Sequence, residues 1–386
     1  MAVYKIFPYK DSTLYSLYPN SNFGLDAMSE VNNSVGVSGT PDVARFLTQF
    51  DSNEIQDIIE NKISGSTWDV NFRAFIATAQ GISTQQTLEL YPIAQTWNNG
   101  TGEFGDSPTT TNGVTWVDAS SYGVDPWVLS GSVSGEPITG SYNPTYSTAG
   151  GGNWFYSGSI PGFIIDGYVE DGYVELSTGA NLYTVTQSFN LRSDKDINVG
   201  VKPIVDQWNS GSIPNNGFIV KFNSSIEFST SASVQPIMQF YSVDTNTIYP
   251  PCLEFRWRDY STVLTGSAVS SIVNTVDLKM SLAENPGEFF PESVNKFYIN
   301  VSPLYPTRTY QTSSLFTNLN YLPTSSYYAI KDLATNEFVV NFDTLYTQIS
   351  SDANGNYFTA TLARLFSAAR LDHWRSRKSS DRPVQF

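Results

Sequence analysis

The chain has 386 residues, of which 15% are charged and 14% aromatic, and its formal net charge is −15. This charge argues against a general nucleic-acid binder, which needs a basic surface, and disfavours binding to anionic lipid. The single cysteine, Cys252, excludes an internal disulfide framework, and its apolar neighbours predict a small buried residue. No basic segment followed by an apolar stretch opens the chain, so we expect a soluble protein made in the cytoplasm without a signal peptide.

The first predicted element ends in a sharp corner. Residues 13–18 mix β-branched, aromatic and aliphatic side chains, as strands do, and the sequence "PNSNFG" follows at residues 19–24. Pro19 lacks a backbone donor, the asparagines can bond their own backbone, and Gly24 tolerates positive φ. By itself this local sequence favours an ordinary surface turn.

Strand-like runs then recur at short intervals, and most are bounded by Gly, Asn, Asp, Pro or Ser. Short strands at this regular spacing, separated by turn residues, are typical of a β-sandwich or jelly roll. The predicted strands of the first part span residues 14–18, 45–50, 68–78, 87–93, 163–175, 183–190, 197–201, 217–222, 235–242 and 252–258.

Two helical segments interrupt these strands. One begins at Asp51 or Ser52, which can cap it, and carries a stripe of isoleucines. A second, short one fits residues 201–208. The Asn-Asn-Gly sequence at 215–217 then predicts a tight corner that leads into a buried strand at 218–222.

Composition divides the chain into three parts. Residues 1–260 form a large domain with a long loop inserted at 130–153, which is rich in Gly, Ser and Thr. Residues 261–363 carry a fresh set of strands and predict a second β domain. Residues 364–386 form a basic tail.

Six motifs of the first part follow one another in order: "YKDSTLYSLYPNSNFG", "ARFLTQFD", "TLELYPIAQTWNNGTGEF", "VTW", "DINVGVKPIVDQWNSGSIPNNGFIVKF" and "MQFYSVDTNTIYPPCLEFRW". This series resembles the DNRLRE family of jelly-roll domains, which is related to carbohydrate-binding modules. The resemblance covers about two thirds of the chain; the loop at 130–153 departs from it, and Arg45 only weakly matches the family's arginine. It implies that the opening corner lies where the first strand of a jelly roll leaves its sheet.

Later motifs, "PLYPTRTYQTSS" and "YLPTSSYYAIKDLATNEFVVNFDTLYTQISSDANGNYF", resemble virion structural proteins of T-even-like myophages from marine cyanobacteria. Together the resemblances imply an all-β chain, with a large jelly-roll β-sandwich followed by a smaller immunoglobulin-like β-sandwich. They imply a structural protein of the tail, neck or surface appendage of a tailed-phage virion, present in several copies and bound to other virion proteins. The alternatives are a glycan- or receptor-binding module acting as an adhesin and, less favoured, a polysaccharide-degrading enzyme.

Catalytic patterns are sparse, so we expect no enzyme. His373 is the single imidazole and lies in the basic tail, which argues against a Ser-His-Asp or Cys-His arrangement. The segment "DGYVEDGYVEL" at 166–176 holds four carboxylates, but Asp-Gly and period-two spacing favour solvated hairpin residues over a glycosidase pair. Asp166 and Asp171 are candidate calcium ligands, because calcium binds carboxylate oxygens on loops, and no other cofactor is expected. A structural turn is the favoured interpretation, since no EF-hand-like spacing accompanies them.

Aromatic side chains beside planar polar ones could bind host surface glycans, because a sugar ring presents an apolar face and hydroxyl groups. Trp116, Trp208 and Trp257 are expected in the core. The candidate glycan platform is the set that flanks the Gly-rich loop: Trp127, Trp154 and Tyr156.

The basic tail holds six cations against Asp372 and Asp381. It departs from the pattern of the myophage proteins, so no role is carried onto it by resemblance. On so acidic a chain, the charge of the tail suits docking to an acidic partner surface, and a frayed end is the alternative. The candidate docking residues are Arg375, Arg377, Lys378 and Arg382.

Overall fold

The computed structural model describes residues 2–35, 41–65, 67–82, 85–121, 123–127, 131–133, 136–138, 151, 155–156, 169–170, 173–174, 183–227, 235–262, 278–283, 294–304, 320–331 and 338–361. The chain divides into two compact units. The large unit comprises residues 6–59 and 70–254, and the small unit comprises residues 1–5, 60–69 and 255–386. The domain boundary expected near residue 260 therefore lies close to the end of the large unit, but two N-terminal segments cluster with the C-terminal part.

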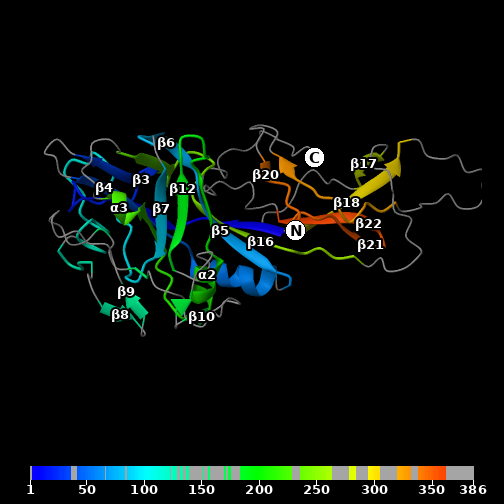
Figure 1. The fold of residues 1–386 in the computed structure, drawn as a ribbon, viewed down its shortest axis with the longest axis horizontal. Helices are drawn as coiled ribbons and strands as arrows, with labels where there is room; N and C mark the ends of the chain where they lie inside the picture. The colour runs from blue at the N-terminus through cyan, green and yellow to red at the C-terminus, as the bar shows by residue number, and fades with distance from the viewer. Residues whose placement is uncertain are drawn as a thin grey trace, which may run out of the picture. The chain divides into compact units, whose positions relative to one another are not determined.

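An eight-stranded antiparallel sheet dominates the large unit. Its strand order is β12-β7-β14-β4-β3-β15-β6, with β2 paired to β4. Figure 1 shows β7 and β12 side by side, in keeping with their pairing. The strands are β2 (Lys10–Tyr15), β3 (Met28–Val35), β4 (Pro41–Gln49), β6 (Ile76–Gln80), β7 (Gln86–Pro92), β12 (Val185–Phe189), β14 (Phe218–Phe222) and β15 (Ile237–Tyr241).

A four-stranded sheet has the order β1-β16-β5-β13. Its members are β1 (Ala2–Ile6), β5 (Trp68–Ala74), β13 (Ile197–Gly200) and β16 (Cys252–Trp257). Within the large unit this sheet packs on the larger one, since the ring centroids of Phe72 on β5 and Phe218 on β14 lie 5.6 Å apart. Both rings are fully buried, so the two sheets form a β-sandwich.

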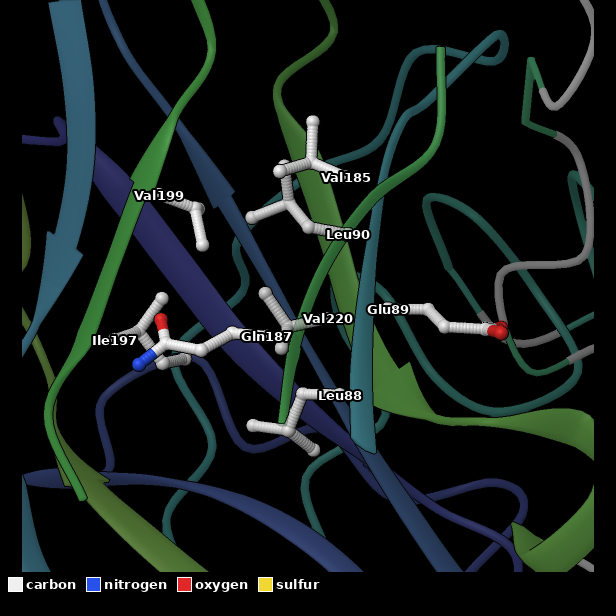
Figure 2. A pocket seen from close by; sticks show the side chains of 8 residues that line it. All are labelled: Leu88, Glu89, Leu90, Val185, Gln187, Ile197, Val199 and Val220. Carbon is white, nitrogen blue, oxygen red and sulfur yellow. The ribbon is translucent and has the colours of Figure 1, made fainter. Parts of the chain in front are cut away.

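Figure 2 shows how strand alternation builds this core. Leu88 and Leu90 of β7 point toward Ile197 and Val199 of β13, whereas Glu89 points the opposite way. The cavity between these side chains has a volume of about 10 Å³, which is room for about one water molecule. It is therefore a packing gap and not a ligand site.

Helices α1 and α2 lie where the sequence predicts them, whereas α3 was not predicted. Helix α1 (Ser52–Asp57) is capped by the Asp51 carboxylate, which accepts a hydrogen bond of 2.9 Å from the Asn53 backbone, and the π-helix η1 (Ile58–Lys62) follows. Helix α2 (Lys202–Asn209) packs the Trp208 ring 4.6 Å from Phe218. Helix α3 (Ser224–Glu227) follows β14.

The small unit contains another four-stranded sheet, of order β17-β18-β22-β21, and the strand pair β19–β20. The ring centroids of Phe297 and Tyr328 lie 5.1 Å and 4.3 Å from that of Phe358, at the centre of a separate buried core. The strands are β17 (Leu278–Leu282), β18 (Val294–Pro303), β19 (Ile330–Lys331), β20 (Phe338–Val340), β21 (Ser350–Asp352) and β22 (Gly355–Thr361).

The prediction of an all-β chain built of β-sandwiches is confirmed. Two further strand pairs are present. The pair β8 (Gly131–Val133) with β9 (Glu136–Ile138) lies within the segment predicted as an inserted loop, and the pair β10 (Val169–Glu170) with β11 (Tyr173–Val174) lies within the doubled Asp-Gly sequence. Trp116, Trp208, Trp257 and Cys252 are buried, as expected. No helix within the described ranges is long and apolar enough to cross a membrane.

Candidate interaction surface

The corner after β2 is held by one side chain, Asn22, which is 1% exposed. Its Nδ2 donates to the carbonyls of Asn99 and Val114, at 2.7 Å and 2.8 Å. Its Oδ1 accepts from the backbone N–H of Gly24 at 3.2 Å and of Gly102 at 2.8 Å. Both N–H donors of the Asn22 amide and both lone pairs of its oxygen are therefore used, and these bonds hold the corner against the loop at 97–114.

Glycine allows the corner and this loop to approach so closely. A Cβ at Gly24 would lie 2.2 Å from the Asn99 carbonyl oxygen. Gly100 has φ +84°, and a Cβ there would lie 2.2 Å from the Asn112 carbonyl oxygen. The corner is therefore a backbone-to-backbone junction within the large unit, although Leu17, Tyr18 and Asn20 remain exposed as in a surface turn. The expectation that the corner lies where the first strand leaves its sheet is wrong, because β2 and β3 on either side of it both pair with β4 in the same sheet.

This junction carries a cluster of aromatic rings that reaches the surface. Tyr15 and Phe23 are buried with ring centroids 4.7 Å apart. Phe104 lies 6.0 Å from each of them and 5.8 Å from Tyr18, mostly in edge-on geometry. Phe104 is nevertheless 62% exposed and Tyr18 is 46% exposed, so the cluster presents two rings to solvent.

We call the two exposed rings of this cluster, Tyr18 and Phe104, the aromatic patch; Leu17, next to Tyr18 in the sequence, and Leu25 are exposed as well. Leu17 and Leu25 are 44% and 38% exposed, and the Leu25 backbone bonds the Gly102 carbonyl at 3.0 Å. Apolar side chains gathered in this way on a surface mark interaction sites more often than single exposed residues do.

Carboxylates border the aromatic patch. Asp26 accepts a hydrogen bond of 2.7 Å from the Phe104 backbone, and Asp106 accepts one of 3.0 Å from the Glu103 backbone. Burial, together with the smaller effect of the charges of Glu103 and Asp106, raises the pKa of Asp26 to about 6, against the lowering effect of the Phe104 N–H. Among the described residues, no basic side chain forms an ion pair with Asp26, Glu103 or Asp106, which we call the acidic rim.

A second polar cluster lies inside the large unit. The Arg45 guanidinium pairs with the Glu227 carboxylate through two bonds of 2.6 Å and 3.0 Å. Lys221 Nζ lies 3.3 Å from Glu227 and 3.2 Å from Glu89, which also accepts the Tyr91 hydroxyl at 2.8 Å. Two cations therefore face two anions, all but Glu89 almost completely buried, and the arrangement is a closed structural network rather than a site open to a ligand.

This network allows a lysine to lie in the fully buried strand β14. The corner predicted at 215–217 is present, because Gly217 has φ +86° and leads directly into β14. All five residues of β14 are buried, including Lys221, whose charge is neutralised by the two glutamates.

The candidate glycan platform is not formed by the residues named from the sequence. Trp127 is 4% exposed and donates its indole N–H to the Thr115 carbonyl at 3.0 Å. Tyr156 is 1% exposed and its ring lies 5.3 Å from that of Tyr183. The expectation of exposed rings at these two positions is therefore wrong, because both fill the core. Trp154 lies outside the described residues.

The remaining candidate residues also lie outside the described residues. These are the calcium candidates Asp166 and Asp171 and the docking candidates Arg375, Arg377, Lys378 and Arg382. Within the described part of the chain, no group of three or more His, Cys, Asp or Glu side chains is placed to hold a metal ion.

Sequence reasoning missed the aromatic patch, although its signals were present. Tyr18 precedes the "PNSNFG" corner and Phe104 follows "NNGTGE", two turn-rich segments in which a large aromatic residue is unusual. Only the Asn22 junction brings these segments together. A scan of the chain against protein-family models finds no match, and a search of curated proteins finds no significant relative.

Proposed function

We propose that this protein is a structural component of a tailed-phage virion that works through protein–protein contacts and performs no reaction. The large unit would be a DNRLRE-like jelly roll and the small unit an immunoglobulin-like sandwich. The proposal draws its virion context from the motif series, and the confirmed all-β architecture is compatible with it. A place in the tail, neck or a surface appendage, in several copies, follows from the same resemblance.

The observation that carries the contact-based role is the aromatic patch. Phe104 and Tyr18 expose much of their rings yet are anchored on buried Tyr15 and Phe23. Rigid aromatic side chains that lose little conformational entropy are typical of the centre of protein interfaces. A surface that exists only for solubility would carry charged side chains at these positions.

Antibodies raised against the recombinant chain test the virion assignment. Particles purified from the phage that encodes the chain should be labelled at the tail, neck or head surface in negatively stained images. Particles that lack the chain, by labelling and by mass spectrometry of their proteins, would overturn the assignment. An antibody blocked with the recombinant chain is the control.

The second candidate function is glycan binding, and the same patch favours it. An exposed aromatic ring beside carboxylates, here Phe104 beside Asp26 and Asp106, is the arrangement on which a sugar ring can stack. Binding of host surface glycan that is lost in Phe104→Ala would support it. Release of reducing ends from that glycan, abolished by Asp171→Asn or Glu170→Gln, would instead support the polysaccharide-degrading alternative.

A further inference from the structure

The aromatic patch and the acidic rim together select the chemistry of a partner. Three carboxylates, Asp26, Glu103 and Asp106, lie beside exposed rings, and the described basic side chains leave them without an ion pair. A partner that buries the rings would bury carboxylates with them. Such burial is unfavourable unless the partner supplies cations.

Arginine is the cation best suited both to cover the exposed rings and to pair with the carboxylates. Its guanidinium is planar, stacks on aromatic faces, and pairs with carboxylates through two parallel bonds. The large unit already uses this geometry internally, because the Arg45 guanidinium lies 5.2 Å from the centre of the Trp116 ring while pairing with Glu227. The partner expected at the aromatic patch is thus an arginine-rich segment with apolar residues of its own.

The chain itself contains a segment of this chemistry. Residues 364–386 hold six cations, five of them arginines, against two aspartates, and they include Trp374 and Phe386. The rest of the chain is strongly acidic, so this charge contrast is confined to the C-terminal end. Attraction between the two surfaces would be favourable at low salt and screened at high salt.

We propose that the C-terminal segment 364–386 of one copy of the chain docks on the aromatic patch and acidic rim of a second copy. The inference rests on the proposed role in assembly and names the partner for it. The contact joins different surfaces of the two copies, so it is heterologous. Repetition of such a contact closes a ring or extends a filament, which suits a multi-copy virion component.

Sedimentation velocity of the full chain tests the contact. Wild-type protein should self-associate, and Phe104→Ala should weaken association at least tenfold. The double variant Arg375→Glu/Arg377→Glu should weaken it similarly, and 0.5 M salt should weaken the wild type to the same extent. Leu191→Ala, which removes another exposed apolar side chain of the large unit, is the matched control and should associate like the wild type.

A mixture of the Phe104→Ala and Arg375→Glu/Arg377→Glu variants tests whether the tail of one copy docks on the patch of another copy. The Phe104→Ala copy retains an intact tail, and the Arg375→Glu/Arg377→Glu copy retains an intact patch, so an equimolar mixture should form a heterodimer and stop there. A mixture that stays monomeric, or a wild-type chain that stays monomeric at all concentrations, would overturn the inference.

The fates of the two proposals can be told apart. Antibody labelling of virions together with unaltered self-association of the variants would reject the tail contact and keep the virion role. Tail-dependent self-association of a chain that is absent from virions would reject the virion role and keep the tail contact.

Discussion

Arg45 on β4 and Glu227 in α3 are 182 positions apart in the chain, yet their side chains meet in a two-bonded ion pair that is almost completely buried. Lys221 and Glu89 extend the pair into a network of balanced charge. A buried pair contributes little net stability compared with a well-packed apolar core, but loss of one partner leaves an uncompensated charge.

Arg45→Met should therefore lower the free energy of unfolding by about 3–5 kcal/mol, measured by urea denaturation. The double variant Arg45→Met/Glu227→Leu should recover part of this loss, because no carboxylate is then left unpaired in its place. Lys202→Met removes one partner of the half-exposed pair with Asp206 and should cost at most about 0.5 kcal/mol. Equal losses for Arg45→Met and the double variant would show that the network is not electrostatically coupled.

Asn22→Leu should loosen the junction under the aromatic patch. The substitution removes four hydrogen bonds and leaves backbone groups buried without partners, so we expect a loss of about 2–4 kcal/mol in the free energy of unfolding. Asn20→Leu, at an exposed position of the same corner, is the control and should change stability little. Similar unfolding midpoints for both variants would contradict the role assigned to Asn22.

Gly217→Ala should destabilise the chain for two separable reasons. Gly217 has φ +86°, and an added Cβ would lie 2.1 Å from the Thr48 carbonyl oxygen on the paired strand. We expect a cost of about 2–4 kcal/mol, seen as a lower melting temperature. Gly105 has φ +93° with open space around it, so Gly105→Ala measures backbone strain alone and should cost about 1 kcal/mol. Equal losses of melting temperature in Gly217→Ala and Gly105→Ala would refute the clash with Thr48.

Asp11 makes stability depend on pH. Burial, together with the smaller effect of the charges of Asp244 and Asp26, raises the pKa of Asp11 to about 8, although the Val243 N–H donates a hydrogen bond of 2.7 Å that favours the charged form. The folded state thus keeps a proton that the unfolded state releases above its ordinary pKa of 3.8. Stability contributed by this group is complete below that value and is lost as the pH rises toward 8.

Asp11→Asn stays neutral and retains an acceptor for the Val243 N–H. Relative to the wild type it should be about equally stable at pH 4 and more stable at pH 8, by about 1–3 kcal/mol in urea denaturation. Asp106→Asn removes an exposed carboxylate whose pKa the Thr110 hydroxyl holds below its usual range, so it should not stabilise the protein at pH 8. A stability difference between Asp11→Asn and wild type that does not change with pH would exclude a proton on Asp11.

Features that depend on a few neighbouring residues could be predicted from the sequence. The cap at Asp51, the corner at Gly217 and the turn-punctuated strands all follow from local chemistry: a carboxylate that accepts backbone N–H groups, a residue without Cβ, and alternating side chains. These are present in the structure because no distant contact opposes them.

Which side chains meet, and which face solvent, was decided only by the tertiary structure. Trp127 and Tyr156 were predicted to be surface rings beside a Gly-rich loop, but Trp127 is buried against the segment around Thr115 and Tyr156 against Tyr183. Phe104 is as apolar as they are, yet it stays exposed because the Asn22 junction brings it over Tyr15 and Phe23 with nothing above it in the chain that is described. Hydrophobicity is a property of one residue, whereas burial depends on what packs over it, and the pairing of Arg45 with Glu227 likewise exists only once β4 and α3 are in place.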